Sequence, residues 1–443
     1  MEKVVEYQLR QYFQQNDLFY AAQYGFRPGR STSHALLDLT SYVHDGVDNG
    51  SKVLGIFIDL AKAFDTLNFG VLLEKLERYG VCGTSLKWFN SYLTGRKQRV
   101  VLPCGTTSTD CEVETGVPQG SVLGPLLFII YINDLPKSVP QLKVLLFADD
   151  TSALYRSKNE QELFSTMNTQ LSKLEHYFVL NKLSLNVRKT RAMGFLPKGG
   201  HFHYHDLFLD GQPIQWCCSP GSSEKYFKFL GVLIDDKLTF QHHINRLYGK
   251  LCSASYAVAS SIKVLPLQTC ISVYRALYES NLMYCASTWA GTKTKYLKRI
   301  LGHQTRVLKN MFNLPRVTHI SPALKKHKLL KTCDILSREQ IMVVHSMRKK
   351  LLPSPISGIV KPLQADQVDY RIARNSAHNM EQLRVNIPAF SHHPKPRLAI
   401  AWNQLPESVK SAPLHTFKQD LKEYYFSRYK SECDGWDCQT CHG

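Results

Sequence analysis

The sequence predicts a mixed α/β fold of the α+β type, built on a sheet with split βαβ connections. Residues 53–59 and 143–148 are short runs rich in Val, Ile, Leu and Phe, as expected for buried strands, and both lead into aspartates. Segments with helical spacing of apolar residues lie between and after these runs. This order favours a mixed sheet covered by helices over a helical bundle.

Length and composition exclude several classes of protein. The 443 residues are enough for about three domains. With 44% apolar and 21% charged residues, the chain is neither wholly disordered nor a fibrous repeat. Its longest apolar run, 126–132, is far shorter than the ~18–20 residues that cross a bilayer, and no secretory signal follows Met1. We therefore expect no membrane partner and an intracellular chain with reduced cysteines.

In addition to the strands at 53–59 and 143–148, the first half of the chain predicts four helices and a pair of short strands. Apolar spacing over the first 13 residues indicates a helix, and a second helix begins near Ser31 or Thr32, which are good N-caps. Residues 69–79 form a helix with a leucine face. Residues 99–102 and 111–114 are expected to form a hairpin or two edge strands. Residues 123–135 are almost wholly apolar and predict one buried helix.

The second half predicts a helix over 159–181, a strand over 229–234 and then a helical, basic region. Of the net charge of +19, +16 falls in the window 241–350, which has 19 Lys and Arg against 3 Asp and Glu. A local excess of this kind indicates a bound polyanion, and a solvated basic surface is the alternative. In the helix predicted over 293–312 the cations fill the face opposite the apolar residues; they are Lys295, Lys298, Arg299, Arg306 and Lys309.

The C-terminal quarter begins with Pro and Ser residues at 352–358, which are typical of a linker. An amphipathic helix is predicted near 416–429. Cys433, Cys438, Cys441 and His442 could bind Zn²⁺, but they crowd into ten residues without the usual spacing between two ligand pairs. Both a zinc site and an ordinary polar tail therefore remain open.

Three aspartates are the main candidates for chemistry. Asp59 closes one apolar strand, and Asp149 and Asp150 close another. A carboxylate at the end of a buried strand is costly unless something binds it, and adjacent carboxylates repel each other. Hard oxygen ligands of this kind suit Mg²⁺, and two such ions can clamp the attacking and leaving oxygens of a phosphoryl transfer. For a single Asp-Asp pair, a turn or helix cap would be the simpler interpretation.

Six motifs then appear in an order that resembles the reverse transcriptase of non-LTR (LINE-type, jockey-like) retrotransposons. Each motif alone is weak, but together they extend from residue 23 to residue 234. They are QYGFRPGRST at 23–32, IDLAKAFD at 58–65, GVPQGSVLGP at 116–125, FADD at 147–150, LSLNVRKT at 183–190 and FLGVLI at 229–234. The segment WNQLP at 402–406 also resembles the tail of these elements.

The resemblance implies a right-hand polymerase with fingers, a split-βαβ palm and a thumb. Residues 1–50 then correspond to partial fingers and residues 51–240 to the palm, the reverse transcriptase core. Residues 241–350 correspond to a helical basic thumb, and residues 351–443 to a C-terminal segment with a Cys-rich tail. Because Met1 falls inside the fingers sequence, we expect an N-terminally truncated member that does not encode target nicking.

The resemblance also implies roles for individual residues. Asp59, Asp149 and Asp150 match the carboxylates that hold two Mg²⁺ ions, and Lys189 matches a proton donor to the pyrophosphate leaving group. Phe64 matches an aromatic that abuts the nucleotide sugar, although a core aromatic is the alternative.

Four further residues match nucleotide-binding positions. Gln119 and Gly120 would meet the nucleotide, although a simple turn is the alternative. Arg27 and Arg30 would grip phosphates, although ordinary loop solvation is the alternative.

The expected function is RNA-directed DNA polymerisation from a primer 3′-OH. The implied partners are an RNA template, a DNA primer or target DNA, and dNTPs. Copying at a chromosome implies nuclear residence. The alternative is a catalytically inactive truncated relic that only binds nucleic acid, since a basic group of the missing fingers would help to hold the triphosphate.

Overall fold

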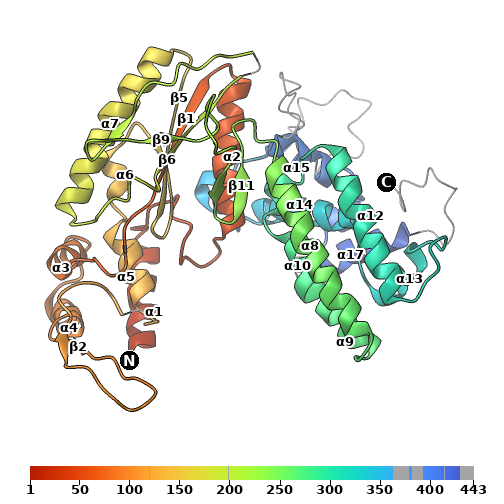
Figure 1. Ribbon diagram of the computed structural model, residues 1–443, viewed down its shortest axis with the longest axis horizontal. Helices are drawn as coiled ribbons and strands as arrows, with labels where there is room; N and C mark the ends of the chain where they lie inside the picture. The colour runs from red at the N-terminus through yellow and green to blue at the C-terminus, as the bar shows by residue number, and fades with distance from the viewer. Residues whose placement is uncertain (119, 198, 363–378, 382–392, 414, 430–443) are drawn as a thin grey trace. The chain divides into compact units, whose positions relative to one another are not determined.

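The computed structural model describes residues 1–118, 120–197, 199–362, 379–381, 393–413 and 415–429 (Figure 1). The chain divides into two compact units. The first comprises residues 1–35 and 49–224, and the second comprises residues 36–48 and 225–443. None of the described helices has both the length and the apolar character needed to cross a membrane.

The first unit is centred on a five-stranded sheet, which confirms the mixed α/β prediction. The strand order is β4-β5-β1-β6-β9, and all neighbours are antiparallel except β6 and β9. The strands are β1 (Lys52–Ile58), β4 (Lys143–Phe147), β5 (Asp150–Ser157), β6 (Arg191–Phe195) and β9 (Gln215–Trp216). The sequence prediction found β1 and β4 but missed β5 and β6.

Helices surround this sheet, and those predicted near 1–13, 69–79 and 159–181 are confirmed. They are α1 (Glu2–Gln15), α3 (Phe69–Arg78) and α7 (Glu160–Leu180), joined by α4 (Gly83–Leu93), α5 (Gly124–Tyr131) and α6 (Leu135–Ser138). Asn68 and Asn159 cap α3 and α7 by accepting backbone N–H bonds in the first turn. Two small ribbons, β2 (Lys97–Gln98) with β3 (Cys111–Glu112) and β7 (Phe208–Leu209) with β8 (Gln212–Pro213), complete the unit.

The single helix predicted over 123–135 is wrong, because α5 ends at Tyr131 and a separate short α6 follows. The polar residues after α5 hydrogen-bond to other elements. Asn133 accepts a bond from the Tyr20 backbone N–H at 2.7 Å and donates to the Leu18 carbonyl at 2.8 Å. Asp134 turns the opposite way, to Lys75. These tertiary bonds outweigh the apolar pattern that favoured a continuous helix.

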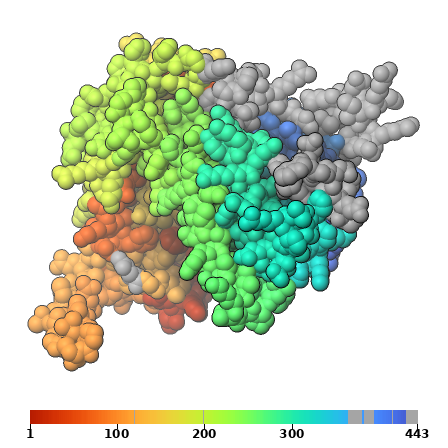
Figure 2. Space-filling view, turned by 45° about the vertical axis from the view of Figure 1, so that its right-hand side comes forward, coloured from red at the N-terminus to blue at the C-terminus, as the bar shows by residue number. Residues whose placement is uncertain are grey.

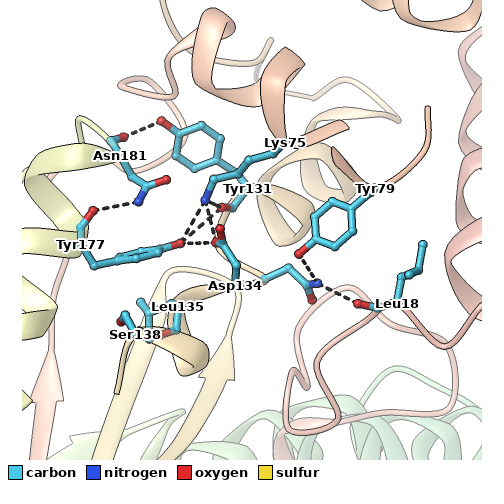
Figure 3. Close-up of polar contacts among 10 residues, drawn as sticks. Leu18, Lys75, Tyr79, Tyr131, Asp134, Leu135, Ser138, Tyr177 and Asn181 are labelled. Carbon is cyan, nitrogen blue, oxygen red and sulfur yellow. Dashed lines mark hydrogen bonds and ion pairs between the residues drawn. The ribbon is translucent and has the colours of Figure 1, made fainter. Parts of the chain in front are cut away.

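A half-buried ion pair, in which the lysine is buried and the aspartate is partly exposed, lies among α3, α5, α6 and α7 (Figure 3). The Nζ of Lys75 on α3 donates to the Tyr131 carbonyl and to Oδ1 of Asp134, each at 2.6 Å. The Tyr177 hydroxyl of α7 donates to the same Asp134 oxygen at 2.6 Å. Burial lowers the pKa of Lys75, and the charge of Asp134 partly opposes that shift. One carboxylate therefore holds helices from three parts of the chain.

The hairpin predicted over 99–102 and 111–114 exists, but its paired residues are β2 and β3, and β2 lies earlier in the chain than predicted. The segment between them is drawn in orange and projects from the first unit in Figure 2. Val100, Val101 and Leu102 in this segment are exposed.

In the described residues of the second unit, helices predominate beside one hairpin and an isolated bridge between Pro362 and Met380. It takes most of α2 (Thr32–Asp48), whose start near Thr32 is confirmed. The remaining helices are α8 (Gln241–Ile262), α9 (Leu267–Tyr274), α10 (Ser280–Met283), α11 (Ala286–Trp289), α12 (Thr294–Met311), α13 (Ser321–His327), α14 (Thr332–Arg348), α15 (Pro394–Asn403), α16 (Glu407–Lys410) and α17 (Phe417–Ser427), with a π-helical turn at Arg275–Glu279 and a 3₁₀ turn at Ser354–Ile356.

Two predictions in this unit need correction. The strand expected over 229–234 is a hairpin of β10 (Phe227–Phe229) and β11 (Val232–Ile234), because Leu230 and Gly231 have φ of +44° and +81° and form a turn. The expected linker at 352–358 contains the 3₁₀ turn, and Ile356 there is buried. The helices predicted over 293–312 and 416–429 are confirmed as α12 and α17.

Candidate active site

The structure brings the three aspartates together at one end of the sheet. β1 and β5 pair antiparallel as far as Ile58 opposite Thr151, so continuing this register places Asp59 opposite Asp150. β4 and β5 form a tight hairpin in which Ala148, with a φ of +56°, and Asp149 make the turn. The carboxylates that lie 90 positions apart in the sequence are therefore neighbours in space.

The electrostatics of the site reflect this crowding. Desolvation by the surrounding protein, then the charge of Asp149 and then that of Asp59, raise the pKa of Asp150 to about 6, although solvent still reaches the side chain. Desolvation and the charge of Asp59 also raise the pKa of Asp149. The charge of Asp59 disfavours ionisation of Asp149 and Asp150, and a cation placed among the three would relieve that repulsion.

Asp59 is held from the side by the segment at 184–190, which belongs to the fifth motif. The Asn186 backbone N–H donates to the Asp59 carbonyl at 2.9 Å, and the Asp59 N–H donates to the Thr190 hydroxyl at 3.3 Å. Nζ of Lys189 lies 4.0 Å from Oδ2 of Asp59, and its side chain is 72% exposed. The structure thus places Lys189 at the carboxylate cluster, with its ammonium group open to solvent.

On the other side of the cluster, three residues for which the sequence predicted no individual role contact the β4–β5 hairpin: Gln23, Tyr24 and Gly25. Oε1 of Gln23 accepts bonds from the backbone N–H groups of Gly25, at 2.8 Å, and Ala148, at 3.2 Å. The Tyr24 N–H donates to the Leu146 carbonyl of β4 at 2.7 Å. A Cβ on Gly25 would lie 2.3 Å from the Ala148 nitrogen, so only glycine allows this approach. Gln23 and Ala148 are 125 positions apart, so no local pattern in the sequence predicts their contact.

Phe64 is half-buried and contacts two other aromatic rings. Its ring stacks on Phe128 of α5 with centroids 4.4 Å apart and meets Phe26 edge-on at 6.2 Å. This packing fits the core-aromatic interpretation, and its remaining exposure leaves the sugar-contact role as a prediction.

Gln119 lies outside the described residues. Gly120 next to it is exposed, with a φ of +83° and no atom within 4 Å of where a Cβ would stand. Backbone conformation, rather than space, therefore favours glycine at this position. Gly116, at the start of the same motif, is different: a Cβ there would lie 2.6 Å from the Asp65 carbonyl oxygen. The motif is thus packed tightly against the loop that follows Asp59.

Arg27 and Arg30 bind the loop they belong to. Nη1 of Arg27 donates to the Tyr20 carbonyl at 2.9 Å, and its guanidinium lies 4.6 Å from the Phe19 ring centroid. Burial lowers the pKa of Arg27 to about 10, so it stays charged at neutral pH. Arg30 donates to the Ala21 carbonyl. Both arginines therefore shape the loop, and phosphate contact by either stays a prediction.

The basic residues predicted on the helix at 293–312 lie on α12 in the second unit. Ile300, Leu301 and Leu308 are buried on one face. On the other face Lys295, Lys298, Arg299 and Arg306 are exposed, whereas Lys309 is half-buried and donates to the Arg316 carbonyl at 2.6 Å. The predicted amphipathic character of the helix is thus confirmed.

The donor set of the cluster fits a divalent cation. The three side chains offer carboxylate oxygens, and desolvation, followed by the charges of neighbouring carboxylates, raises the pKa values of Asp149 and Asp150. Within the described ranges no group of three or more His, Cys, Asp or Glu side chains is arranged to hold a metal ion. Mg²⁺ does not require one, because it is commonly held by one or two carboxylates together with water and substrate phosphates. The predicted zinc ligands Cys433, Cys438, Cys441 and His442 lie outside the described residues.

A sheet that brings strand-end carboxylates together beside a tight acidic hairpin is suited to two-metal phosphoryl transfer, a chemistry used by polymerases and nucleases. A sequence model of the family described as "Reverse transcriptase (RNA-dependent DNA polymerase)" matches residues 1–234. The chain belongs to this reverse transcriptase family, and members of the family use divalent metal ions.

Two similar proteins come from mobile elements of Drosophila melanogaster. The chain is 28% identical over 293 residues to "Probable RNA-directed DNA polymerase from transposon X-element", a match covering 64% of this chain and 31% of the relative. It is 25% identical over 379 residues to "RNA-directed DNA polymerase from mobile element jockey", covering 82% of this chain and 40% of the relative. The chain thus spans well under half the length of these relatives.

Among solved structures, telomerase from Candida albicans is similar at 13% identity with a TM-score of 0.42, over 74% of this chain and 57% of that one.

Proposed function

We propose that this chain is the RNA-directed DNA polymerase domain of a jockey-like non-LTR retrotransposon. It would extend a primer 3′-OH on an RNA template. The observation that carries the proposal is the meeting of Asp59 with Asp149 and Asp150 across β1 and the β4–β5 hairpin. The family match and the mobile-element relatives support the same activity.

The carboxylates of Asp59, Asp149 and Asp150 would hold two Mg²⁺ ions. When bound, these ions supply charge stabilisation at the attacking and leaving oxygens. Lys189 stands 4.0 Å from Asp59 with its ammonium group exposed, where it would donate a proton to departing pyrophosphate. Phe64, anchored on Phe128, would exclude a 2′-OH from the nucleotide site. Gln119 and Gly120 would bind the nucleotide beside it.

The remaining assignments follow from the same activity. The partial fingers would be residues 1–50 and the palm residues 51–240. The thumb would be residues 241–350, followed by a C-terminal segment at 351–443. Arg27 and Arg30 would bind phosphates of the triphosphate or of the template. The exposed cations of α12 would hold duplex phosphates in a salt-dependent way. Partners would be an RNA template, primer or target DNA and dNTPs, with copying in the nucleus.

Primer extension tests the proposal. Purified chain with Mg²⁺, poly(rA)/oligo(dT) and dTTP should extend the primer. Asp149→Asn should reduce extension at least about 10³-fold, since it removes a metal ligand whose charge stabilisation is several kcal/mol. Binding of the same duplex should stay within about twofold, because the side chain keeps its shape.

Asp110→Asn is the matched control, because Asp110 is an exposed aspartate outside the cluster and its loss should leave extension unchanged. If wild type and Asp149→Asn bind the duplex alike and neither extends it, the chain is a binding-only relic.

A further inference from the structure

The loop at 116–123 makes a sharp turn just before α5. The Ser121 backbone N–H donates to the Pro118 carbonyl at 3.1 Å, and Gly120 between them has a φ of +83°. The Ser121 hydroxyl then accepts the Gly124 backbone N–H at 3.0 Å. A Cβ on Gly124 would lie 2.7 Å from that hydroxyl oxygen, so the turn packs closely onto the start of α5. The position of Gly120 therefore depends on what holds Ser121 and its neighbours.

Glu2, in the first turn of α1, holds the loop after the turn. Its Oε2 accepts the Val122 backbone N–H at 2.8 Å, and its Oε1 accepts the hydroxyl of Tyr92 on α4 at 2.7 Å. Helices α1 and α4 lie at the same end of the first unit as α5 (Figure 1). The bond from Tyr92 is the largest cause of a lowered pKa at Glu2, and burial opposes it. Glu2 is therefore ionised at neutral pH and accepts bonds from two elements.

Tyr92 connects this carboxylate back to the turn. Desolvation, followed by the bond to Glu2, raises the pKa of Tyr92 to about 12, so the hydroxyl keeps the proton that it donates. A hydrogen bond from the Ser121 side chain opposes that rise. The ring of Tyr92 stacks on Trp88 with centroids 5.3 Å apart. A tyrosine that is held by its ring thus bonds both Glu2 and the turn.

Arg96 holds the beginning of the same loop. Its Nη2 donates to the Gly116 carbonyl at 2.7 Å, and its Nε donates to the Leu93 carbonyl at the end of α4 at 3.1 Å. Gly120 between the two fixed ends is exposed, with no atom within 4 Å of where a Cβ would stand. An exposed turn between fixed ends is suited to meet a ligand without first having to become ordered.

We propose that Glu2 and Tyr92 are positioning residues for the incoming nucleotide, an inference that rests on the function proposed above. They would act through Ser121 and Val122, which lead to the turn at Gly120. Without them the turn would adopt several conformations, and the dissociation constant of the nucleotide rises as the competent fraction falls. The carboxylate cluster lies on β1 and the β4–β5 hairpin, which carry neither residue, so the chemical step should change less.

Primer extension by the full chain on poly(rA)/oligo(dT), with dTTP varied, tests this role. Glu2→Ala should raise KM for dTTP about fivefold and change kcat by less than about twofold. Glu2→Gln should restore most of the wild-type KM, because its amide oxygen can still accept the Val122 N–H. Tyr92→Phe should raise KM about threefold, and the double variant with Glu2→Ala should have the KM of Glu2→Ala alone, because both residues serve one network.

Glu162→Ala is the matched control. Glu162 also lies in the first turn of a helix, α7, and accepts the hydroxyls of Tyr155 at 3.0 Å and Ser157 at 2.7 Å. It should leave KM for dTTP unchanged. The proposal is overturned if Glu2→Ala and Glu162→Ala have the same KM. It is also overturned if Glu2→Ala lowers kcat and duplex affinity by as large a factor as it raises KM, which would indicate a general loss of folding.

A binding measurement separates this role from the polymerase assignment. Anisotropy of fluorescein-labelled dUTP is measured with Mg²⁺ on the complex of the chain with the same duplex. If no primer is extended and Glu2→Ala, but not Glu162→Ala, weakens this binding, the positioning role stands and the proposed function fails. Equal binding by wild type and Glu2→Ala overturns the positioning role, and primer extension by both would leave the proposed function intact.

Discussion

At the scale of single residues, the position of the acidic hairpin depends on a loop far away in the sequence. The side chain of Gln23 accepts a hydrogen bond from the backbone N–H of Ala148. Ala148 has a φ of +56°, a backbone conformation that residues other than glycine rarely adopt. Gly25 lies so close that its missing side chain makes the contact possible. Gln23 and Gly25 thus help to position the hairpin that carries Asp149 and Asp150.

Gly25→Ala should displace the hairpin. The added carbon would meet Ala148 backbone atoms, which cannot move without moving Asp149. We expect a loss of about 1–3 kcal/mol in the free energy of unfolding and a fall in extension larger than the fall in duplex binding. Gly249→Ala in α8 is the control, because no atom lies within 4 Å of its added carbon, and it should not destabilise the chain. Equal behaviour of the two variants would contradict the proposed contact.

Asp150→Asn should make the metal-free chain more stable at neutral pH. The pKa of Asp150 is raised to about 6, above the ~3.9 of an unfolded chain, so the folded state binds more protons between these values. Ionised Asp150 lowers the free energy of unfolding. This loss is absent below about pH 4, grows as the pH rises to 6 and reaches its full size above pH 6.

Thermal unfolding in EDTA checks this dependence. Because solvent reaches the side chain, the gain for Asp150→Asn should be about 1 kcal/mol or less, roughly 1–3 °C in Tm at pH 7.5. The difference from wild type should vanish near pH 4. A gain that is constant with pH would show that ionisation is not its cause.

At the scale of elements, the Lys75–Asp134 pair shows how helices from separate parts of the chain are held beside the sheet. Lys75→Met would leave the Asp134 carboxylate and the Tyr131 carbonyl without their cation. We expect a loss of about 2–4 kcal/mol in the free energy of unfolding, measured by urea denaturation.

Two further variants test the cause. Arg78→Met breaks an exposed pair with Glu74 and should cost less than about 0.5 kcal/mol. Lys75→Met/Asp134→Leu should recover part of the loss, because no charge is then left unpaired. A double variant less stable than Lys75→Met would contradict this account.

The sequence could predict elements whose pattern is local. The strands before Asp59 and Asp149 are continuous apolar runs, and their acidic ends identified the site. β5 was missed because it opens with Asp150, Thr151 and Ser152, polar residues typical of a loop, although Thr151 and Ser152 are buried in the sheet. The turn at Leu230 was missed because an apolar leucine with a positive φ leaves no trace in composition. The Gln23 contact was missed because it is long-range.

At the scale of the whole molecule, α2 crosses the boundary between the two units. Residues 36–48 belong with 225–443, and Lys395 donates to both carboxylate oxygens of Asp45 at 2.6 Å. The rings of His44 and His393 stack with centroids 4.7 Å apart. The second unit is therefore not continuous in sequence.

Leu37→Ala should destabilise the second unit more than the first. Leu37 is fully buried on α2, so its truncation should cost about 2–5 kcal/mol. Amide hydrogen exchange of the full chain should rise in α14 and α15 and change little in β1 and β5. Val4→Ala, an exposed position on α1, is the control and should change neither region. Faster exchange confined to β1 and β5 would contradict the division into units.

The split membership of α2 also has a consequence for synthesis on the ribosome. All residues of the first unit have been synthesised once position 224 has been translated. Residues 36–48 of α2 belong to the second unit, whose other residues, 225–443, are synthesised later. At about 5–20 residues per second, the ~180 residues from the end of α2 to position 225 take roughly 10–40 s. During that interval an apolar helix is left uncovered on the nascent chain, where chaperones or a neighbouring copy could capture it.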